Sequence, residues 1–118
     1  MNTRNDVREF MQGCGQTQDD HDQASLYMRL VVEEFNELLV AFAENNLVEI
    51  ADACADLKWV IEGLEHSLKI PQQAVWDEVN RSNRSKFQNG VLIKHPMTGK
   101  VQKPDTYSPP DIKSILGV

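Results

Sequence analysis

Cysteine, long apolar runs and a secretory signal are scarce or missing in this chain, and each absence narrows its class. Cys14 and Cys54 are too few for a disulfide framework, so we expect both to be free thiols. The longest uninterrupted apolar run, Leu38–Ala43, is far too short to span a bilayer. Because the N-terminal sequence is polar and mixed in charge, we expect a cytoplasmic protein with no membrane contact.

Positive charge is also scarce. The chain has 12 Lys and Arg residues against 18 Asp and Glu, a net charge of −6. General nucleic-acid-binding proteins usually carry a basic excess, so we expect no nucleic-acid partner. A nucleotide substrate is still compatible with this charge, since bound metal ions would reverse the local field. The length of 118 residues suits one domain, which we expect to span residues 1–118.

Apolar residues at helical spacing predict four helices, at about 2–14, 23–44, 47–68 and 71–86. The turn at Asn45-Asn46 is too short for anything but a tight reversal, so the second and third helices should pair antiparallel. Residues 91–93 and 100–102 flank a turn containing Pro and Gly, which predicts a small hairpin. We therefore expect an all-α, antiparallel four-helix bundle-like fold with a short C-terminal hairpin and tail.

The same spacing predicts which side chains are buried. In the second helix the expected core stripe is Val31, Phe35, Leu38 and Phe42. Cys54, Trp59 and Trp76 are expected to pack in the interior, whereas the three histidines (His21, His66 and His95) are expected on the surface. Asp22 or Ser25 should cap the second helix, and Asp111 should cap a last helical turn.

Negative charge is concentrated where positive charge is absent. The stretch from Glu33 to Asp56 contains no Lys, Arg or His but holds seven acids: Glu33, Glu34, Glu37, Glu44, Glu49, Asp52 and Asp56. Either short acidic row alone is typical of a solvated helix face. However, the acids of both helices border the apolar stripe, and unneutralised they would repel one another. Magnesium prefers oxygen ligands and often bridges one or two carboxylates to substrate phosphates, so we interpret the rows as a magnesium site for a nucleotide.

These residues also carry a resemblance. Glu33-Glu34-x-x-Glu37 followed by Glu49-x-x-Asp52 resembles the paired signature of the MazG-like all-α nucleoside triphosphate pyrophosphohydrolases. Three segments resemble the phosphoribosyl-ATP pyrophosphohydrolase-like branch: residues 49–60 (EIADACADLKWV), 78–86 (EVNRSNRSK) and 99–111 (GKVQKPDTYSPPD). The resemblance runs from about Leu26 to Asp111.

The resemblance implies hydrolysis of a nucleoside triphosphate to the monophosphate and pyrophosphate. It implies a site with about two or three Mg²⁺ or Mn²⁺ ions. The implied metal ligands are Glu33, Glu34, Glu37, Glu49, Asp52 and Asp56, and Glu33 and Glu37 are also the implied catalytic residues. The candidate substrate-binding residues are Asn80, Asn83, Lys86, Lys100, Lys103 and Tyr107. The resemblance further implies a homo-oligomer, either a tetramer or an intertwined dimer.

Several alternatives stay open. The base cannot be read from the sequence: dUTP, dCTP and dGTP all suit a phage or bacterial enzyme of nucleotide-pool control, and phosphoribosyl-ATP is a further candidate substrate. A non-enzymatic helical interaction module would explain the apolar stripes but not the acidic rows. A di-iron protein is disfavoured, since such proteins use Glu-x-x-His pairs and the chain contains none.

Overall fold

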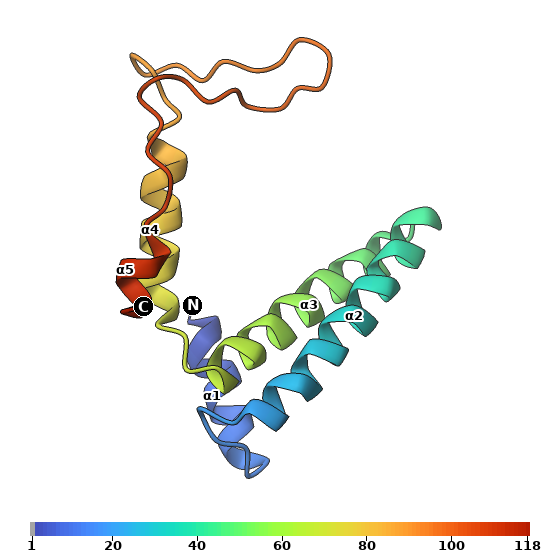
Figure 1. The fold of residues 1–118 in the computed structure, drawn as a ribbon. Coiled ribbons are helices and arrows are strands. Elements are labelled where there is room, and N and C mark those ends of the chain that lie inside the picture. The colour runs from blue at the N-terminus through green and yellow to red at the C-terminus, as the bar shows by residue number, and fades with distance from the viewer. Residues whose placement is uncertain (1) are drawn as a thin grey trace. The chain divides into compact units, whose positions relative to one another are not determined.

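The computed structural model describes residues 2–118 and is built from helices (Figure 1). The helices are α1 (Thr3–Gly13), α2 (His21–Ala43), α3 (Leu47–Ser67), α4 (Gln72–Arg84) and α5 (Ile112–Leu116). No strand occurs among the described residues, so the all-α prediction is confirmed. None of these helices combines the length and the apolarity that crossing a bilayer requires. The residues up to Ile70 form one compact unit and Pro71–Val118 forms another; the single-domain assignment of residues 1–118 stays a prediction.

The central element of the N-terminal unit is the antiparallel pair of α2 and α3, which lie side by side in Figure 1. The chain reverses at Asn45, whose φ of 53° places it in the left-handed region that Asn tolerates better than most residues. Asn46 then caps α3, because its Oδ1 accepts a hydrogen bond from the Glu49 backbone N–H at 3.2 Å. The predicted tight reversal is confirmed.

A small core forms where α1 packs against α2 and α3. Its buried residues are Val7, Met11, Tyr27 and Val60, with Leu30, Val31, Leu57 and Leu64 packed around them. Gly63 lets the Tyr27 ring lie directly on α3, since a Cβ at that position would overlap the ring. The Tyr27 hydroxyl donates a hydrogen bond to Gln16 Oε1 at 2.6 Å. This packing fixes one end of the α2–α3 pair and leaves the other end without cover from α1 (Figure 1).

The start of α2 differs from the prediction. Asp20, and neither Asp22 nor Ser25, is the N-cap, with its Oδ1 accepting from the Gln23 backbone N–H at 3.1 Å. Asp20 is held in this position because its own N–H donates to the Ser67 carbonyl at 2.8 Å. A tertiary hydrogen bond therefore starts the helix two residues before Gln23, where the sequence pattern predicted it to begin.

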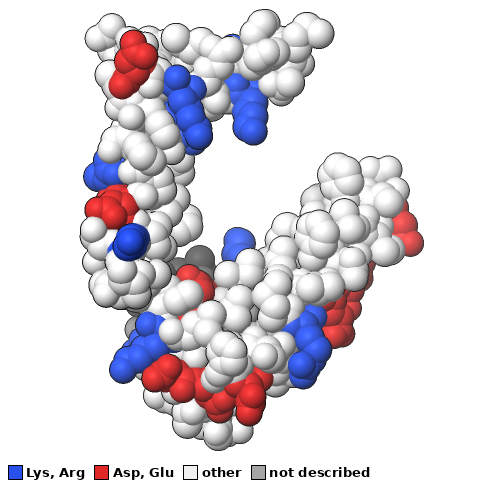
Figure 2. All heavy atoms as spheres, in the orientation of Figure 1, with Lys and Arg blue, Asp and Glu red and all other residues white. Residues whose placement is uncertain are grey.

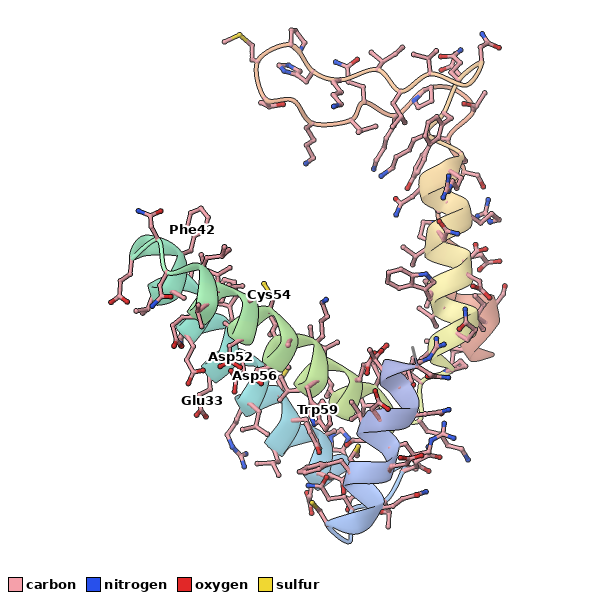
Figure 3. All side chains as sticks on the ribbon, turned by 180° about the vertical axis from the view of Figure 1, so that it is seen from behind. Glu33, Phe42, Asp52, Cys54, Asp56 and Trp59 are labelled. Carbon is pink, nitrogen blue, oxygen red and sulfur yellow. The ribbon has the colours of Figure 1, made fainter. Side chains whose placement is uncertain are left out.

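Several burial predictions are wrong for the single chain. Phe35 and Phe42 are 48% and 72% exposed, and Cys54 is exposed on the face of α3 away from Asp52 and Asp56 (Figure 3). Trp76 is also exposed. His66, expected on the surface, is only 4% exposed, because its Nε2 donates to the Arg4 carbonyl at 3.0 Å. Its position between α1 and α3 follows from tertiary packing that no local pattern encodes.

The C-terminal unit is organised by Glu78 on α4. Its carboxylate accepts bonds of 2.7 and 2.9 Å from the Arg81 guanidinium and one of 2.7 Å from the Asp111 backbone N–H. Asp111 in turn caps α5, as predicted, by accepting from the Ser114 N–H at 3.2 Å. The predicted hairpin consists of an isolated antiparallel bridge between Lys94 and Val101 within the described residues. The hydrogen bond from the Asp111 N–H to Glu78 therefore holds the C-terminal tail against α4.

Candidate metal centre

Three carboxylates converge between the two long helices. Glu34 and Glu37 stand three residues apart on α2 and so share one face, and the antiparallel pairing brings Asp56 of α3 opposite them. One oxygen from each of the three lies within 4.8 Å of the others. The sequence predicted a site of six acids, and the structure brings three of them together.

The environment of Glu34 is unfavourable for a charged group. Its Oε2 is shielded from solvent and has no hydrogen-bond partner among residues 2–118. Burial, together with a hydrogen-bonding contact with Glu37 and the charges of Glu37, Asp56 and Glu33, raises the pKa of Glu34 to about 7. Burial and the charges of Asp52 and Glu37 likewise raise the pKa of Asp56. Without a bound cation, the folded chain therefore favours the protonated forms of the Glu34 and Asp56 carboxyl groups.

The ligand atoms that Glu34, Glu37 and Asp56 offer are suited to a divalent ion. All three ligands are carboxylate oxygens, which suit Mg²⁺ or Mn²⁺. Their ligand oxygens lie within 4.8 Å of one another, a range that includes the ~4.2 Å between opposite ligands of an octahedral magnesium ion. A bound cation would also stabilise the shielded Oε2 of Glu34, which has no hydrogen-bond partner among the described residues.

The other three predicted ligands lie outside this convergent group. Glu33 on α2 and Asp52 on α3 are exposed (Figure 3). Glu49 on α3 is exposed too. Asp52 still acts on the centre through its charge, which contributes to the raised pKa of Asp56. Glu49 lines a groove of about 550 Å³ together with Glu37, and the rest of its lining is Asn36, Val40, Ala41 and Glu44. The groove thus links one exposed acid to the convergent group.

All six predicted substrate-binding residues lie in the C-terminal unit, and four of them gather around Tyr107. The ammonium groups of Lys86 and Lys103 lie 5.9 and 4.9 Å from the centroid of the Tyr107 ring, close enough for cation–π attraction. Lys86 Nζ also donates to Asn83 Oδ1 at 3.0 Å. The remaining two lie elsewhere in this unit: Asn80 accepts from Arg84 Nε at 3.4 Å, and Lys100 is exposed on the hairpin.

A charge pattern in this unit was missed by the sequence reasoning, although the sequence contains it. The stretch 79–104 holds six Lys and Arg residues and no acid: Arg81, Arg84, Lys86, Lys94, Lys100 and Lys103. Figure 2 shows basic side chains exposed on the C-terminal unit and acidic side chains along the α2–α3 pair. Arg84 and Phe87 join Asn83 and Lys86 in lining a cavity of about 320 Å³. The average net charge concealed this basic segment.

Comparison with known proteins supports the enzymatic interpretation of this geometry. The family model for phosphoribosyl-ATP pyrophosphohydrolase matches residues 7–83, which include α2, α3 and the convergent carboxylates. The chain is also 30% identical over 78 residues to "Uncharacterized protein L479" of Acanthamoeba polyphaga mimivirus. That alignment covers 64% of this chain and 31% of the relative, so the chain spans about a third of that protein's length.

Enzymes of this family are pyrophosphohydrolases that act on nucleotides, and MazG-like enzymes of this kind generally depend on a metal. The matched region covers well over half of the chain. The chain belongs to the phosphoribosyl-ATP pyrophosphohydrolase family, within the MazG-like superfamily of nucleoside triphosphate pyrophosphohydrolases.

Proposed function

We propose that this chain hydrolyses a (deoxy)nucleoside triphosphate to the monophosphate and pyrophosphate, as an enzyme of nucleotide-pool control. The observation that carries the proposal is the convergence of Glu34, Glu37 and Asp56, with a shielded carboxylate oxygen that has no partner. Carboxylates on a solvated helix face are hydrated, whereas a bound cation would give this shielded oxygen the partner that it lacks.

In this proposal Glu34, Glu37 and Asp56 hold Mg²⁺ or Mn²⁺, and Glu33, Glu49 and Asp52 supply ligands for further ions. When bound, the ions neutralise phosphate charge and lower the pKa of a bound water. Because the pKa of Glu34 is raised to about 7, that carboxyl group must lose its proton before it can act as a charged ligand. Glu33 and Glu37 have the catalytic roles, and the exposed Glu33 is the residue proposed to accept a proton from water.

The proposed substrate-binding residues are Asn80, Asn83, Lys86, Lys100, Lys103 and Tyr107. Support comes from the acid-free stretch 79–104 and from the two ammonium groups beside Tyr107. Ammonium groups bind phosphate oxygens, and Asn carboxamides can bind a sugar or a base edge. A basic unit of this kind suits the phosphate chain of a nucleotide.

A homo-oligomer, either a tetramer or an intertwined dimer, is part of the proposal. Large apolar side chains remain exposed along the α2–α3 pair: Val32, Phe35, Leu39, Val40, Phe42, Leu47 and Val48 are each at least 48% exposed. Many exposed apolar side chains on two neighbouring helices mark an interaction site more often than a solvated face. A second copy of this chain carries the same apolar surface and is the proposed occupant.

Phosphoribosyl-ATP is the second candidate substrate, favoured by the description of the matching family. A turnover assay over dUTP, dCTP, dGTP, the ribonucleotides and phosphoribosyl-ATP, with Mg²⁺ or Mn²⁺ and with EDTA, separates the candidates. We expect metal-dependent release of pyrophosphate from at least one of them. Turnover that is equal in EDTA, or none with any of these nucleotides, would contradict the proposal.

A further inference from the structure

A second cavity of about 380 Å³ lies in the N-terminal unit, away from the carboxylates. It is lined by Arg8, Met11, Gln12, Gln16, Thr17, Gln18 and His66. His66 stands ten residues beyond Asp56 on α3, which is about 15 Å along the helix axis. The cavity therefore belongs neither to the convergent acids nor to the C-terminal basic unit.

The loop and the inner wall of this cavity are held in place before any ligand binds. The loop from Cys14 to Asp20 is anchored by Gln23, whose side chain bonds to both Thr17 backbone groups, at 3.1 and 2.6 Å, and to Ser67 Oγ at 2.8 Å. On the other side, the buried Tyr27 bonds to Gln16. Met11 and His66, only 3% and 4% exposed, form the inner wall. A preformed cavity of this size binds a ligand without first ordering a loop.

The polar side chains around the cavity include several donors that bond to no other protein group. In the part of the chain that the structure describes, the side chains of Arg8, Gln12 and Gln18 have no hydrogen-bond or ion-pair partner. Gln16 uses its carbonyl oxygen to accept from Tyr27, which leaves its amide nitrogen as a further donor. No carboxylate is among the lining residues, although residues 1–70 contain 14 Asp and Glu against five Lys and Arg.

We propose that this cavity is a binding site for a small organic oxyanion, held by the Arg8 guanidinium and the carboxamides of Gln12, Gln16 and Gln18. A guanidinium forms its strongest hydrogen bonds with carboxylate or phosphate oxygens, and the carboxamides supply additional donors. Met11 and the His66 ring offer an apolar wall for the ligand's carbon body. The site goes beyond the proposed hydrolytic function and gives the chain a separate means of binding an anionic metabolite.

The test is a titration of ¹⁵N-labelled protein with inorganic phosphate in one arm and succinate in the other, at constant ionic strength in EDTA. Without metal the carboxylate group repels both probes, so binding there is avoided whether or not the chain is an enzyme. We expect saturable shifts of the side-chain amide signals of Gln12, Gln16 and Gln18 with at least one probe. The probe that saturates identifies phosphate or carboxylate as the preferred group.

Arg8→Gln should weaken this binding about tenfold, because the charge-assisted bonds are lost. Arg29→Gln, the same change at an exposed α2 position outside the lining, should leave the affinity unchanged. Gln12→Ala provides a second variant of the site if Arg8→Gln alters the backbone spectrum. The proposal is overturned if neither probe saturates the amide shifts, if both lining variants bind like the parent, or if Arg29→Gln weakens binding equally.

Discussion

Glu34→Gln tests the electrostatics of the carboxylate centre without reference to catalysis. The pKa of Glu34 is about 7 in the folded chain, against 4.5 for an ordinary glutamate. Between pH 4.5 and about pH 7 the folded state binds more protons than the unfolded state. The free energy of unfolding therefore falls as pH rises through this range. Glutamine has nearly the same shape and no charge, so the variant lacks this loss of stability.

The expected change in the free energy of unfolding follows from the shift in the pKa of Glu34. A pKa rise from 4.5 to about 7 sets a ceiling of ~3 kcal/mol on the destabilisation at high pH. Solvent reaches part of this centre and screens its charges, which reduces the expected value to ~1 kcal/mol. Without metal, the stability of Glu34→Gln relative to the parent should therefore increase by ~1 kcal/mol between about pH 5 and pH 8.

Urea denaturation in EDTA at the two pH values measures this difference, with Glu9→Gln on α1 as a matched control at an exposed glutamate. The effect of Glu78 does not interfere, because that residue titrates below this window. With millimolar Mg²⁺ the order should reverse, since metal binds only the folded parent tightly and stabilises it. An identical stability difference at both pH values, with no response of the parent to Mg²⁺ or Mn²⁺, would refute the metal centre.

Four further predictions follow from the same structure. Glu37→Gln should abolish turnover while circular dichroism and the oligomeric state stay unchanged, and full activity would remove Glu37 from the site. Replacing Lys100 and Lys103 by Ala should raise KM for the nucleotide more than it changes metal affinity, because these residues are proposed to touch substrate and not the ions. Light scattering at micromolar concentration should give a dimer or tetramer, and a monomer would leave the exposed apolar surface of α2 and α3 unexplained. The hydrogen bonds from Arg81 and from the Asp111 N–H lower the pKa of Glu78 to about 2, so this residue's stabilisation of the tail is complete above about pH 4.5 and is lost as pH falls toward 2. The protection of the Asp111 amide, taken as its exchange rate relative to the intrinsic rate at the same pH, should fall over that range, and in Glu78→Gln already at neutral pH.

The helices were predictable because their signals are local. Asn46 marks the start of α3 by its capping side chain, and the two-residue turn before it leaves α2 and α3 no alternative to antiparallel pairing. The convergence of Glu34, Glu37 and Asp56 follows from the same two facts, helical spacing and pairing direction. This part of the candidate site was therefore accessible from the sequence.

The errors arose where tertiary contacts decide the outcome. His66 is buried because α1 offers it the Arg4 carbonyl, and Asp20 caps α2 because Ser67 holds its backbone. Phe42 fits an apolar stripe, yet within residues 2–70 no element covers that end of the pair, and its side chain is 72% exposed. Periodicity identifies an apolar face but does not say which partner covers it. The basic stretch 79–104 was overlooked for a simpler reason, since the whole-chain charge averages over two units of opposite sign.

Chromatography of the reaction products, without added pyrophosphatase, tests the central claim most directly. With Mg²⁺ or Mn²⁺ and an accepted nucleoside triphosphate, the account predicts equal amounts of the monophosphate and pyrophosphate, with no orthophosphate as a primary product. The same reaction with Glu37→Gln should give neither product, whereas Glu9→Gln should match the parent. Stoichiometric nucleoside diphosphate and orthophosphate from the parent would contradict the proposed pyrophosphohydrolase reaction.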